Sequence, residues 1–193
     1  MRAAYDADGL VDVAVRVFLE RGYDGASMSD IARAARLGKS SIYHHVTGKE
    51  ELLERGIRRA LDALFAALDE PACSTGPAVD RLRAVIGRTV EIMTEQPAEV
   101  ALLLRVRGNT AAERWALERR REFDRIVTAI VTEARAAGDV RADLDPALVT
   151  RLVFGMSNSV VEWYRPEGPL TAEGIVAAIC TIVFEGLVAQ EDR

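Results

Sequence analysis

The chain has 193 residues, a formal net charge of −5 and two cysteines. This length suffices for one packed core, or for a small module joined to a larger one, but not for two full-sized domains. The net negative charge argues against a protein that coats nucleic acid over its whole surface. Because neither cysteine lies in a C-x-x-C or Cys/His cluster, the composition also argues against a disulfide framework, a metal site or a metal cofactor.

Features of secreted and membrane proteins are not expected from this sequence. Asp6 and Asp8 fall where a secretory signal would be apolar. The longest uncharged apolar run, residues 174–184, is well below the ~20 residues that a bilayer span needs. With two cysteines that we expect to stay reduced, these features predict a soluble cytoplasmic protein.

The charged residues are unevenly distributed along the chain. Residues 1–66 hold 10 Lys and Arg against 10 Asp and Glu, whereas residues 67–193 hold 15 against 20. Both lysines and both histidines of the chain lie within residues 27–49, and residues 32–49 contain four Lys and Arg but no Asp or Glu. A basic patch is therefore expected near the N-terminus of an otherwise balanced or acidic protein.

The first part of the chain is predicted to form a three-helix head followed by a connecting helix. Apolar residues recur every three or four positions, which is typical of helices, and no stretch alternates as a strand would. Helices are expected over residues 8–21, 28–35, 39–45 and 49–68, with a helix end at Gly22. Two capping boxes support these boundaries: one has Ser27 and Asp30, and the other has Thr47 and Glu50.

The rest of the chain is predicted to form longer helices beyond a loop at residues 70–77. Helices are expected over residues 78–95, from Pro97 onward, over 111–137, over 146–164 and from Thr171 to about residue 188. A third capping box, with Thr110 and Glu113, opens the helix that begins at residue 111. The chain is thus predicted to be all-α with about nine helices, divided into a head (residues 1–48) and a larger helical domain (residues 49–193).

Two short helices joined by three or four residues fit the helix-turn-helix pattern, in which the second helix enters the major groove of DNA. A helix from residue 39 to residue 45 is only about 10 Å long, so it touches few bases and has to work in pairs. Ser, Tyr and His side chains suit base edges, thymine methyls and phosphates, and Lys neutralises phosphate. The DNA-contacting candidates are Ser27, Met28, Arg36, Lys39, Ser40, Ser41, Tyr43, His44 and Lys49.

Residues 10–57 resemble the DNA-binding domain of the TetR family of bacterial transcriptional repressors. Three motifs carry the resemblance: F-x-E-R-G-Y at 18–23, S-M-x-D-I-A at 27–32 and S-x-Y-H-H-V-x-G-K-E-E-L at 41–52. The resemblance implies an all-α homodimer with a variable C-terminal ligand domain and dimerisation through the last two helices. It also implies a double-stranded DNA operator as partner.

Two positions depart from the family pattern. Arg36 stands where the family usually has Gly in the turn, and Gly38 stands where it usually has a Ser cap. A Gly cap is only a few tenths of a kcal/mol worse than Ser, so we expect the fold to survive. We expect Arg36 to add a phosphate contact.

Two C-terminal helices contain more apolar residues than a surface helix needs. At the end of a DNA-binding protein, such helices suggest a four-helix interface between two protomers, with half-sites roughly 34 Å or a multiple apart. The alternative is that these residues form intrachain core. The interface candidates are Met156, Val160, Trp163, Tyr164, Ile179 and Val183.

A small-molecule effector is expected from weaker signals. Asn158 and Glu162 share a stripe with Arg151 on an otherwise apolar helix and could be the few polar groups of a pocket. The alternative is that this stripe faces solvent. The run from Asn158 to Leu170 resembles the C-terminal region of TetR-family regulators of lipid, steroid or aromatic-acid catabolism, some of which respond to acyl-CoA thioesters. The ligand-binding candidates are Met93, Leu103, Arg107, Trp115, Phe123, Phe154, Asn158 and Glu162.

Two classes of function stay open. The first is a repressor released from a palindromic operator by a small, largely apolar ligand; the second is a DNA-binding regulator without an effector, controlled by a protein partner or by its abundance. An enzyme is not expected, because the sequence has no nucleophile–base pair, metal set or cofactor loop. In the first class, a ligand that prefers one of two conformations shifts the population, and the helix that begins at Lys49 is expected to carry the motion.

Overall fold

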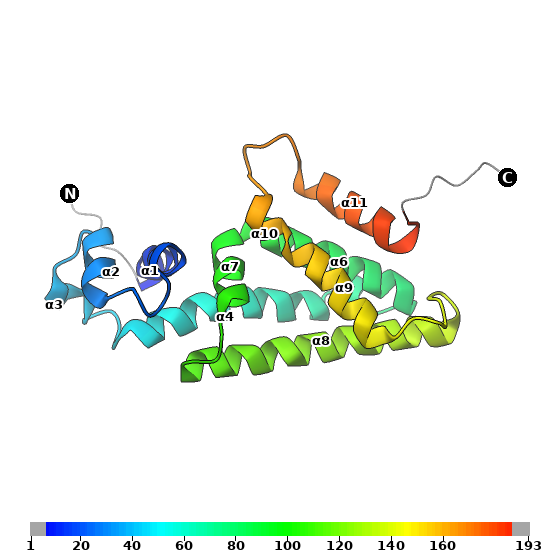
Figure 1. The fold of residues 1–193 in the computed structure, drawn as a ribbon, viewed down its shortest axis with the longest axis horizontal. Helices are drawn as coiled ribbons and strands as arrows, with labels where there is room; N and C mark the ends of the chain where they lie inside the picture. Colours follow the sequence, from blue (N-terminus) through cyan, green and yellow to red (C-terminus); the bar gives the residue numbers. More distant parts are fainter. Residues whose placement is uncertain (1–6, 187–193) are drawn as a thin grey trace. The chain divides into compact units, whose positions relative to one another are not determined.

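The computed structural model describes residues 7–186, in which helices are joined by turns and loops and no strand occurs (Figure 1). The predicted all-α class is confirmed. The described residues form eleven helices, whereas about nine were predicted. One extra helix is a single turn in the 70–77 loop, and the other arises because a predicted helix is broken near residue 159. The helices are α1 Ala7–Arg21, α2 Met28–Ala34, α3 Lys39–Ile42, α4 Lys49–Asp69, α5 Pro71–Ser74, α6 Ala78–Glu95, α7 Pro97–Arg105, α8 Ala111–Ala137, α9 Pro146–Asn158, α10 Val160–Trp163 and α11 Ala172–Phe184.

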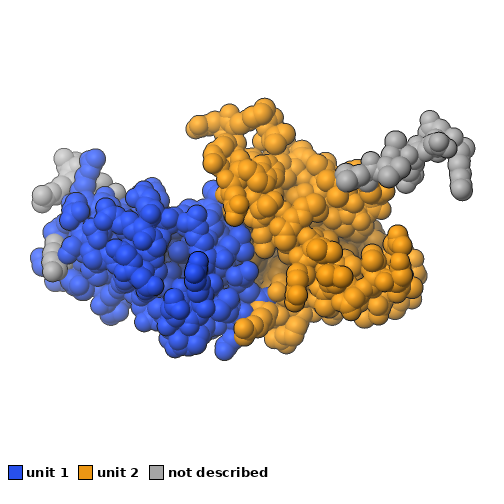
Figure 2. Space-filling model, viewed as in Figure 1, with its two compact units in different colours: residues 1–62, 96–120 blue, residues 63–95, 121–193 orange. Residues whose placement is uncertain are grey.

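The chain forms two compact units, which Figure 2 shows in blue and orange. Unit 1 comprises residues 1–62 and 96–120, and unit 2 comprises residues 63–95 and 121–193. Helices α4 and α8 each contribute to both units. More than the predicted head therefore packs with the helix-turn-helix segment. The functional division at residue 48 stays a prediction, because compactness does not test which part binds which partner.

Most helix boundaries follow from local capping signals. Gly22 takes a φ of 74° after α1, a left-handed conformation that glycine adopts without a Cβ clash. At α2, the Ser27 hydroxyl accepts from the Asp30 backbone N–H while the Asp30 carboxylate accepts from that of Ser27, so the predicted capping box is confirmed. Thr110 and Glu113 form the same reciprocal pair at α8.

The capping box predicted for Thr47 and Glu50 has a different partner. The backbone N–H and the hydroxyl of Thr47 both donate to Glu51 Oε2, at 2.6 and 2.8 Å. Glu50 instead accepts from the backbone N–H of Ala112 at 3.2 Å, in the first turn of α8. Because α4 begins at Lys49, its third residue is Glu51, and the carboxylate of Glu51 rather than that of Glu50 accepts from Thr47. The pairing of Thr47 with Glu50 was wrong.

Three helices are shorter than predicted. Helix α11 ends at Phe184, and Gly186 follows with a left-handed φ of 87°; residues 187 and 188 of the predicted helix lie outside the described residues. Helix α3 ends at Ile42, because the N–H groups of His44 and His45 bond to carbonyls only three residues back and tighten the chain into a turn. The helix predicted over 146–164 breaks at Ser159, whose hydroxyl donates to the Met156 carbonyl at 2.7 Å and disturbs the helical ladder there.

Each unit has its own apolar core. In unit 1, α1 and α4 approach so closely at Gly56 that an added Cβ would lie 2.7 Å from the Val15 side chain. In unit 2, the rings of Phe65, Phe123 and Phe154 stack edge to face, with centroid distances of 5.8 and 5.6 Å. Within residues 7–186, no helix combines the length and apolarity that a bilayer crossing requires.

Candidate nucleic-acid interface

The turn between α2 and α3 is built around Arg36. Its φ of 54° lies in the left-handed region, which L-residues with a Cβ rarely adopt. The Leu37 N–H bonds back to the Ala32 carbonyl at 2.9 Å, so the turn is closed by the backbone despite the missing glycine. The Arg36 side chain is exposed beside α3. Gly38 begins α3 without any side-chain cap, as its sequence implies.

The outward face of the helix-turn-helix is formed by side chains that have no partner within the described chain. Ser40, Tyr43 and His44 are exposed, and their side chains make no hydrogen bond or ion pair within residues 7–186. Ser41 is half-buried, while Ile42 and Val46 are buried underneath and anchor the segment. Lys39 contributes the first backbone position of α3, but its side chain lies outside the described part of the structure.

Ser27 and Met28 lie at the start of α2. The Ser27 hydroxyl is occupied by the capping box: it accepts from the Asp30 N–H at 3.1 Å and donates to the Asp30 carboxylate at 2.5 Å. Met28, the first residue of the helix, is half-buried. Both positions therefore support the helix end, and their contact with DNA stays a prediction.

The basic face contains one carboxylate, and that carboxylate is neutralised. Asp30 is the sole acid between residues 25 and 49, and it lies 2.9 Å from the Arg21 guanidinium and 3.4 Å from that of Arg33. Hydrogen bonds from Ser27, reinforced by these arginines, lower the pKa of the Asp30 carboxyl. Unit 1 carries 15 Lys and Arg against 13 Asp and Glu, while unit 2 carries 10 against 17.

Lys49 has a structural role that the sequence did not indicate. Its ammonium donates to the backbone carbonyls of Tyr23 at 2.7 Å and of Ala26 at 2.9 Å, and it lies 4.2 Å from the centroid of the Tyr23 ring. Two of its three donors thus fasten the start of α4 to the turn between α1 and α2. One donor is left for a phosphate, so the predicted DNA contact stays a prediction.

The interface candidates in unit 2 differ in their exposure. Val160 is fully buried and Ile179 is nearly so, so their side chains belong to the core of the protomer. Met156, Tyr164 and Val183 are half-buried, and Trp163 is 46% exposed. Three further apolar residues of these helices, which were not among the interface candidates, are also exposed: Leu148, Leu152 and Ile182.

The ligand candidates are divided between the units. Met93, Phe123 and Phe154 are buried in the core of unit 2, while Asn158 is half-buried and Glu162 exposed. Leu103, Arg107 and Trp115 belong to unit 1. Leu103 is buried there, and the Trp115 ring carries the Arg58 guanidinium at 4.4 Å.

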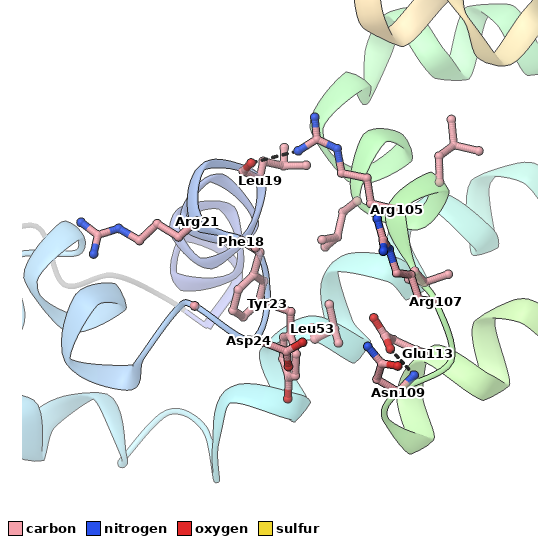
Figure 3. Close-up of a pocket in the computed structure, with 15 residues that line it drawn as sticks. Phe18, Leu19, Arg21, Tyr23, Asp24, Leu53, Arg105, Arg107, Asn109 and Glu113 are labelled. Atoms are coloured by element: carbon pink, nitrogen blue, oxygen red, sulfur yellow. Dashed lines mark hydrogen bonds between the residues drawn. The ribbon is translucent and has the colours of Figure 1, made fainter.

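Arg107 lines a hollow of about 690 Å³ that lies wholly within unit 1 (Figure 3). We call it the head hollow. One wall is the end of α1 and the turn after it, including Phe18, Arg21 and Tyr23. The other wall is the segment that joins α7 to α8, including Arg105, Arg107, Asn109 and the buried Glu113. Sequence reasoning identified one of these residues, because the hollow joins segments more than 80 residues apart.

Comparison with known proteins agrees with the helix-turn-helix geometry. Residues 10–55 match the model of the bacterial regulatory proteins of the tetR family, and residues 75–187 match the model of a tetracyclin repressor-like C-terminal domain. The chain belongs to the TetR family. It is therefore a transcription regulator of the repressor type with a helix-turn-helix DNA-binding segment, as its sequence motifs implied.

Three TetR-family proteins illustrate how far the similarity extends. A crystal structure of a family member from Streptomyces coelicolor A3 is 55% identical, with a TM-score of 0.90 over 98% of this chain and 96% of that one. The transcriptional repressor KstR2 of Mycobacterium tuberculosis is 29% identical over 94% of this chain and 92% of its own length. AibR, solved in complex with isovaleryl coenzyme A and operator DNA, is 25% identical, with a TM-score of 0.80 over 92% of this chain and 97% of that one.

Proposed function

We propose that the protein is a homodimeric repressor that binds a palindromic operator and is released from it by a small, largely apolar ligand. The observation that carries the DNA-binding part is the exposed face of α3, where Ser40, Tyr43 and His44 have no partner within residues 7–186 and lie above the buried Ile42 and Val46. Polar side chains held outward without partners are free to bond base edges and phosphates. The role is regulatory rather than enzymatic, and the expected location is the cytoplasm.

The DNA-binding part is tested by selecting operator sequences from random DNA with the full chain. A palindromic consensus is expected because a helix as short as α3 has to act in pairs. Ser41→Ala and Tyr43→Ala are expected to reduce discrimination between the consensus and random DNA. Arg33→Gln removes an exposed charge from α2 and is expected to weaken binding to the consensus and to random DNA by the same factor. Equal losses on both DNAs for Ser41→Ala and Tyr43→Ala would contradict the assignment of these residues to base recognition.

The dimeric part is supported by exposed apolar side chains on α9, α10 and α11. Leu148 and Leu152 are separated by one helical turn on α9, and they are 50% and 64% exposed. Trp163 and Ile182 add exposed apolar surface on α10 and α11. A second protomer that covers these residues would remove them from water. Exposed apolar surfaces of this kind usually mark sites of protein–protein contact.

The ligand-controlled part is supported by a relative. AibR has been solved with isovaleryl coenzyme A and operator DNA, so a protein of this fold accommodates both kinds of partner. The mechanism needs two conformations that differ in operator affinity and a ligand that binds one of them better. Adding cell metabolite extract to the operator complex tests this part, and release is the expected result.

A second candidate function is a regulator without an effector, controlled by a protein partner or by abundance. One observation favours it: Phe123 and Phe154, two of the expected ligand contacts, are 6% and 7% exposed and stack edge to face in the core of unit 2. The same extract experiment separates the two candidates, because an operator complex that survives every metabolite fraction supports the second.

A further inference from the structure

The geometry points to the head hollow as the effector site of this regulator, with an amphipathic organic anion as its ligand. Such a ligand joins an apolar body to one carboxylate or phosphate group. Of the ligand contacts expected from the sequence, one, Arg107, lines this hollow. The inference deepens the proposed function by naming a ligand class and a site, and its control of DNA rests on that function.

The size and lining of the head hollow suit a small amphipathic molecule. Its volume of about 690 Å³ falls within the 300–1,000 Å³ that ligand pockets usually have. Leu53, Leu102 and Val106 line it as buried apolar residues, and the rings of Phe18 and Tyr23 lie 5.4 Å apart at one wall. These groups favour an apolar body with an aromatic or aliphatic surface.

The cations of the head hollow favour an acidic group on the ligand. Arg107 is exposed, and its guanidinium has no hydrogen bond or ion pair within residues 7–186. Arg105 uses one donor on the Leu19 carbonyl, at 2.9 Å, which Figure 3 shows as a dashed line. A guanidinium has five donors, so both side chains retain donors for a carboxylate or phosphate.

The Glu113 carboxylate and the Tyr23 hydroxyl also line the hollow, but they do not offset its preference for an anionic ligand. Glu113 is buried, and its Oε2 accepts from the backbone N–H groups of Asn109 at 2.6 Å and of Thr110 at 3.2 Å. Its charge is therefore stabilised by the start of α8. Burial, followed by the nearby carboxylates, raises the pKa of the Tyr23 hydroxyl, so this group is neutral at pH 7. The remaining acid at the wall, Asp24, is exposed to solvent screening.

Tyr23 connects the head hollow to the DNA-binding face. Its ring lines the hollow, and its carbonyl and ring together hold the Lys49 ammonium. Lys49 is the first residue of α4 and follows the helix-turn-helix by a few residues. A ligand that displaces Tyr23 therefore acts directly on the contact that fixes the turn between α1 and α2 to the start of α4, just after the recognition segment.

The test uses the full chain and the fluorescent amphipathic anion 8-anilinonaphthalene-1-sulfonate as probe. Wild-type protein is expected to bind the probe. Arg107→Gln is expected to weaken binding about tenfold, the loss that one charge-assisted hydrogen bond implies. Leu104 is a half-buried residue of the lining. Leu104→Trp places a larger side chain in the hollow and is expected to weaken probe binding further. Arg16→Gln removes an exposed charge of α1 outside the lining and serves as the matched control, with affinity unchanged.

Competition identifies the acidic group. Octanoate and octyl phosphate are compared as displacing agents, and the stronger one gives the natural chemistry of the ligand. Octanol has the same chain without a charge and is expected to displace poorly; equal displacement by octanol would overturn the anionic assignment. Equal probe affinity in wild type, Arg107→Gln and Leu104→Trp would overturn the site itself.

Control of DNA is measured separately on the selected operator. The displacing anion is expected to lower operator affinity in wild type and to leave it unchanged in Leu104→Trp. Binding of the probe without any change in operator affinity would overturn the effector role of the site. If no DNA sequence is selected at all, the proposed function fails, while the Arg107-dependent binding of the probe remains a valid result for the site.

Discussion

At the scale of single residues, Lys49 is held by the backbone carbonyls of Tyr23 and Ala26; among the described residues, the one other donor to either carbonyl is the Ala26 N–H, which lies 3.3 Å from the Tyr23 oxygen. Lys49→Ala is therefore expected to destabilise the protein by about 1–3 kcal/mol, because the Tyr23 and Ala26 carbonyls lose a charged hydrogen-bond donor. The measurement is urea denaturation of the full chain. Arg107→Ala is the control: Arg107 is exposed and has no partner among the described residues, so this variant should stay within about 0.5 kcal/mol of wild type. Superimposable unfolding curves for Lys49→Ala and wild type would leave Lys49 with a DNA contact alone.

Arg36 offers a prediction of opposite sign. Its φ of 54° is strained for a residue with a Cβ, so Arg36→Gly is expected to stabilise the fold by about 1 kcal/mol. The same change removes a cation from the DNA-binding face and is expected to weaken binding to all DNA sequences. Arg33→Gly is the matched control: Arg33 is helical, and glycine there should cost about 1 kcal/mol. Thermal denaturation distinguishes the two, and destabilisation by Arg36→Gly would show that the side chain supports the turn.

At the scale of helices, the caps of α2 and α4 make stability depend on pH. Hydrogen bonds from Ser27 lower the pKa of the Asp30 carboxyl, and hydrogen bonds from Thr47 lower that of Glu51. A carboxyl whose pKa is lower in the folded state contributes stability that is fully present above its unfolded pKa and is lost as the pH falls through its folded pKa. The ordinary values are 4.5 for Glu51 and 3.8 for Asp30, so the loss begins below about pH 4.5.

Glu51→Gln and Asp30→Asn are expected to lower stability at pH 7 and to flatten its decline between about pH 4.5 and pH 3. Urea denaturation midpoints measured over this range provide the test. Glu50→Gln is the control for α4, because Glu50 lies one residue away and does not cap that helix. If the denaturation midpoint falls with decreasing pH as steeply in both capping variants as in wild type, these carboxylates do not cause the acid sensitivity of the fold.

Helix boundaries were predictable where the signal is local. The start of α8 at residue 111 and its end before Gly138 follow from a capping box and a glycine, and the structure has the same boundaries. The cap of α4 was mispredicted because Glu50 and Glu51 are adjacent: Thr47 bonds to Glu51, while Glu50 bonds to Ala112, 62 residues away. The early end of α3 has a similar reason: Val46 is buried, and the chain must turn to reach that position.

At the scale of the whole molecule, the exposed apolar side chains of unit 2 predict how the chain associates. Leu152 is 64% exposed on α9, and Leu152→Arg is expected to convert a dimer into a folded monomer, because an unpaired charge would be buried between protomers. Light scattering at micromolar concentration gives the mass, and circular dichroism checks the fold. Leu170→Arg is the matched control, because Leu170 is 55% exposed between α10 and α11. A monomeric wild-type mass would refute the dimer, and a dimeric Leu152→Arg would move the interface elsewhere.

The two halves of the candidate site differ in how much the sequence reveals. The DNA-binding face comes from one continuous stretch, so Tyr43 and His44 were among the DNA-contacting candidates, and both are exposed. The interface and the ligand contacts depend on packing between distant segments. Apolar character alone did not separate Val160, which is buried, from Leu152, which is exposed. Likewise, Arg107 lies in the same hollow as Phe18 through tertiary folding that no local pattern encodes.

The shortness of α3 has a consequence for how such a regulator can diverge. Ile42 and Val46 hold this segment in place, whereas the side chains of Ser40, Tyr43 and His44 make no hydrogen bond or ion pair to the rest of the described chain. Substitutions at the three outward positions should therefore be almost neutral for folding. A duplicated copy of the gene could exchange them one at a time and acquire a new operator without first losing a folded protein. In this segment, the residues expected to select the operator are therefore different from the residues that stabilise the fold.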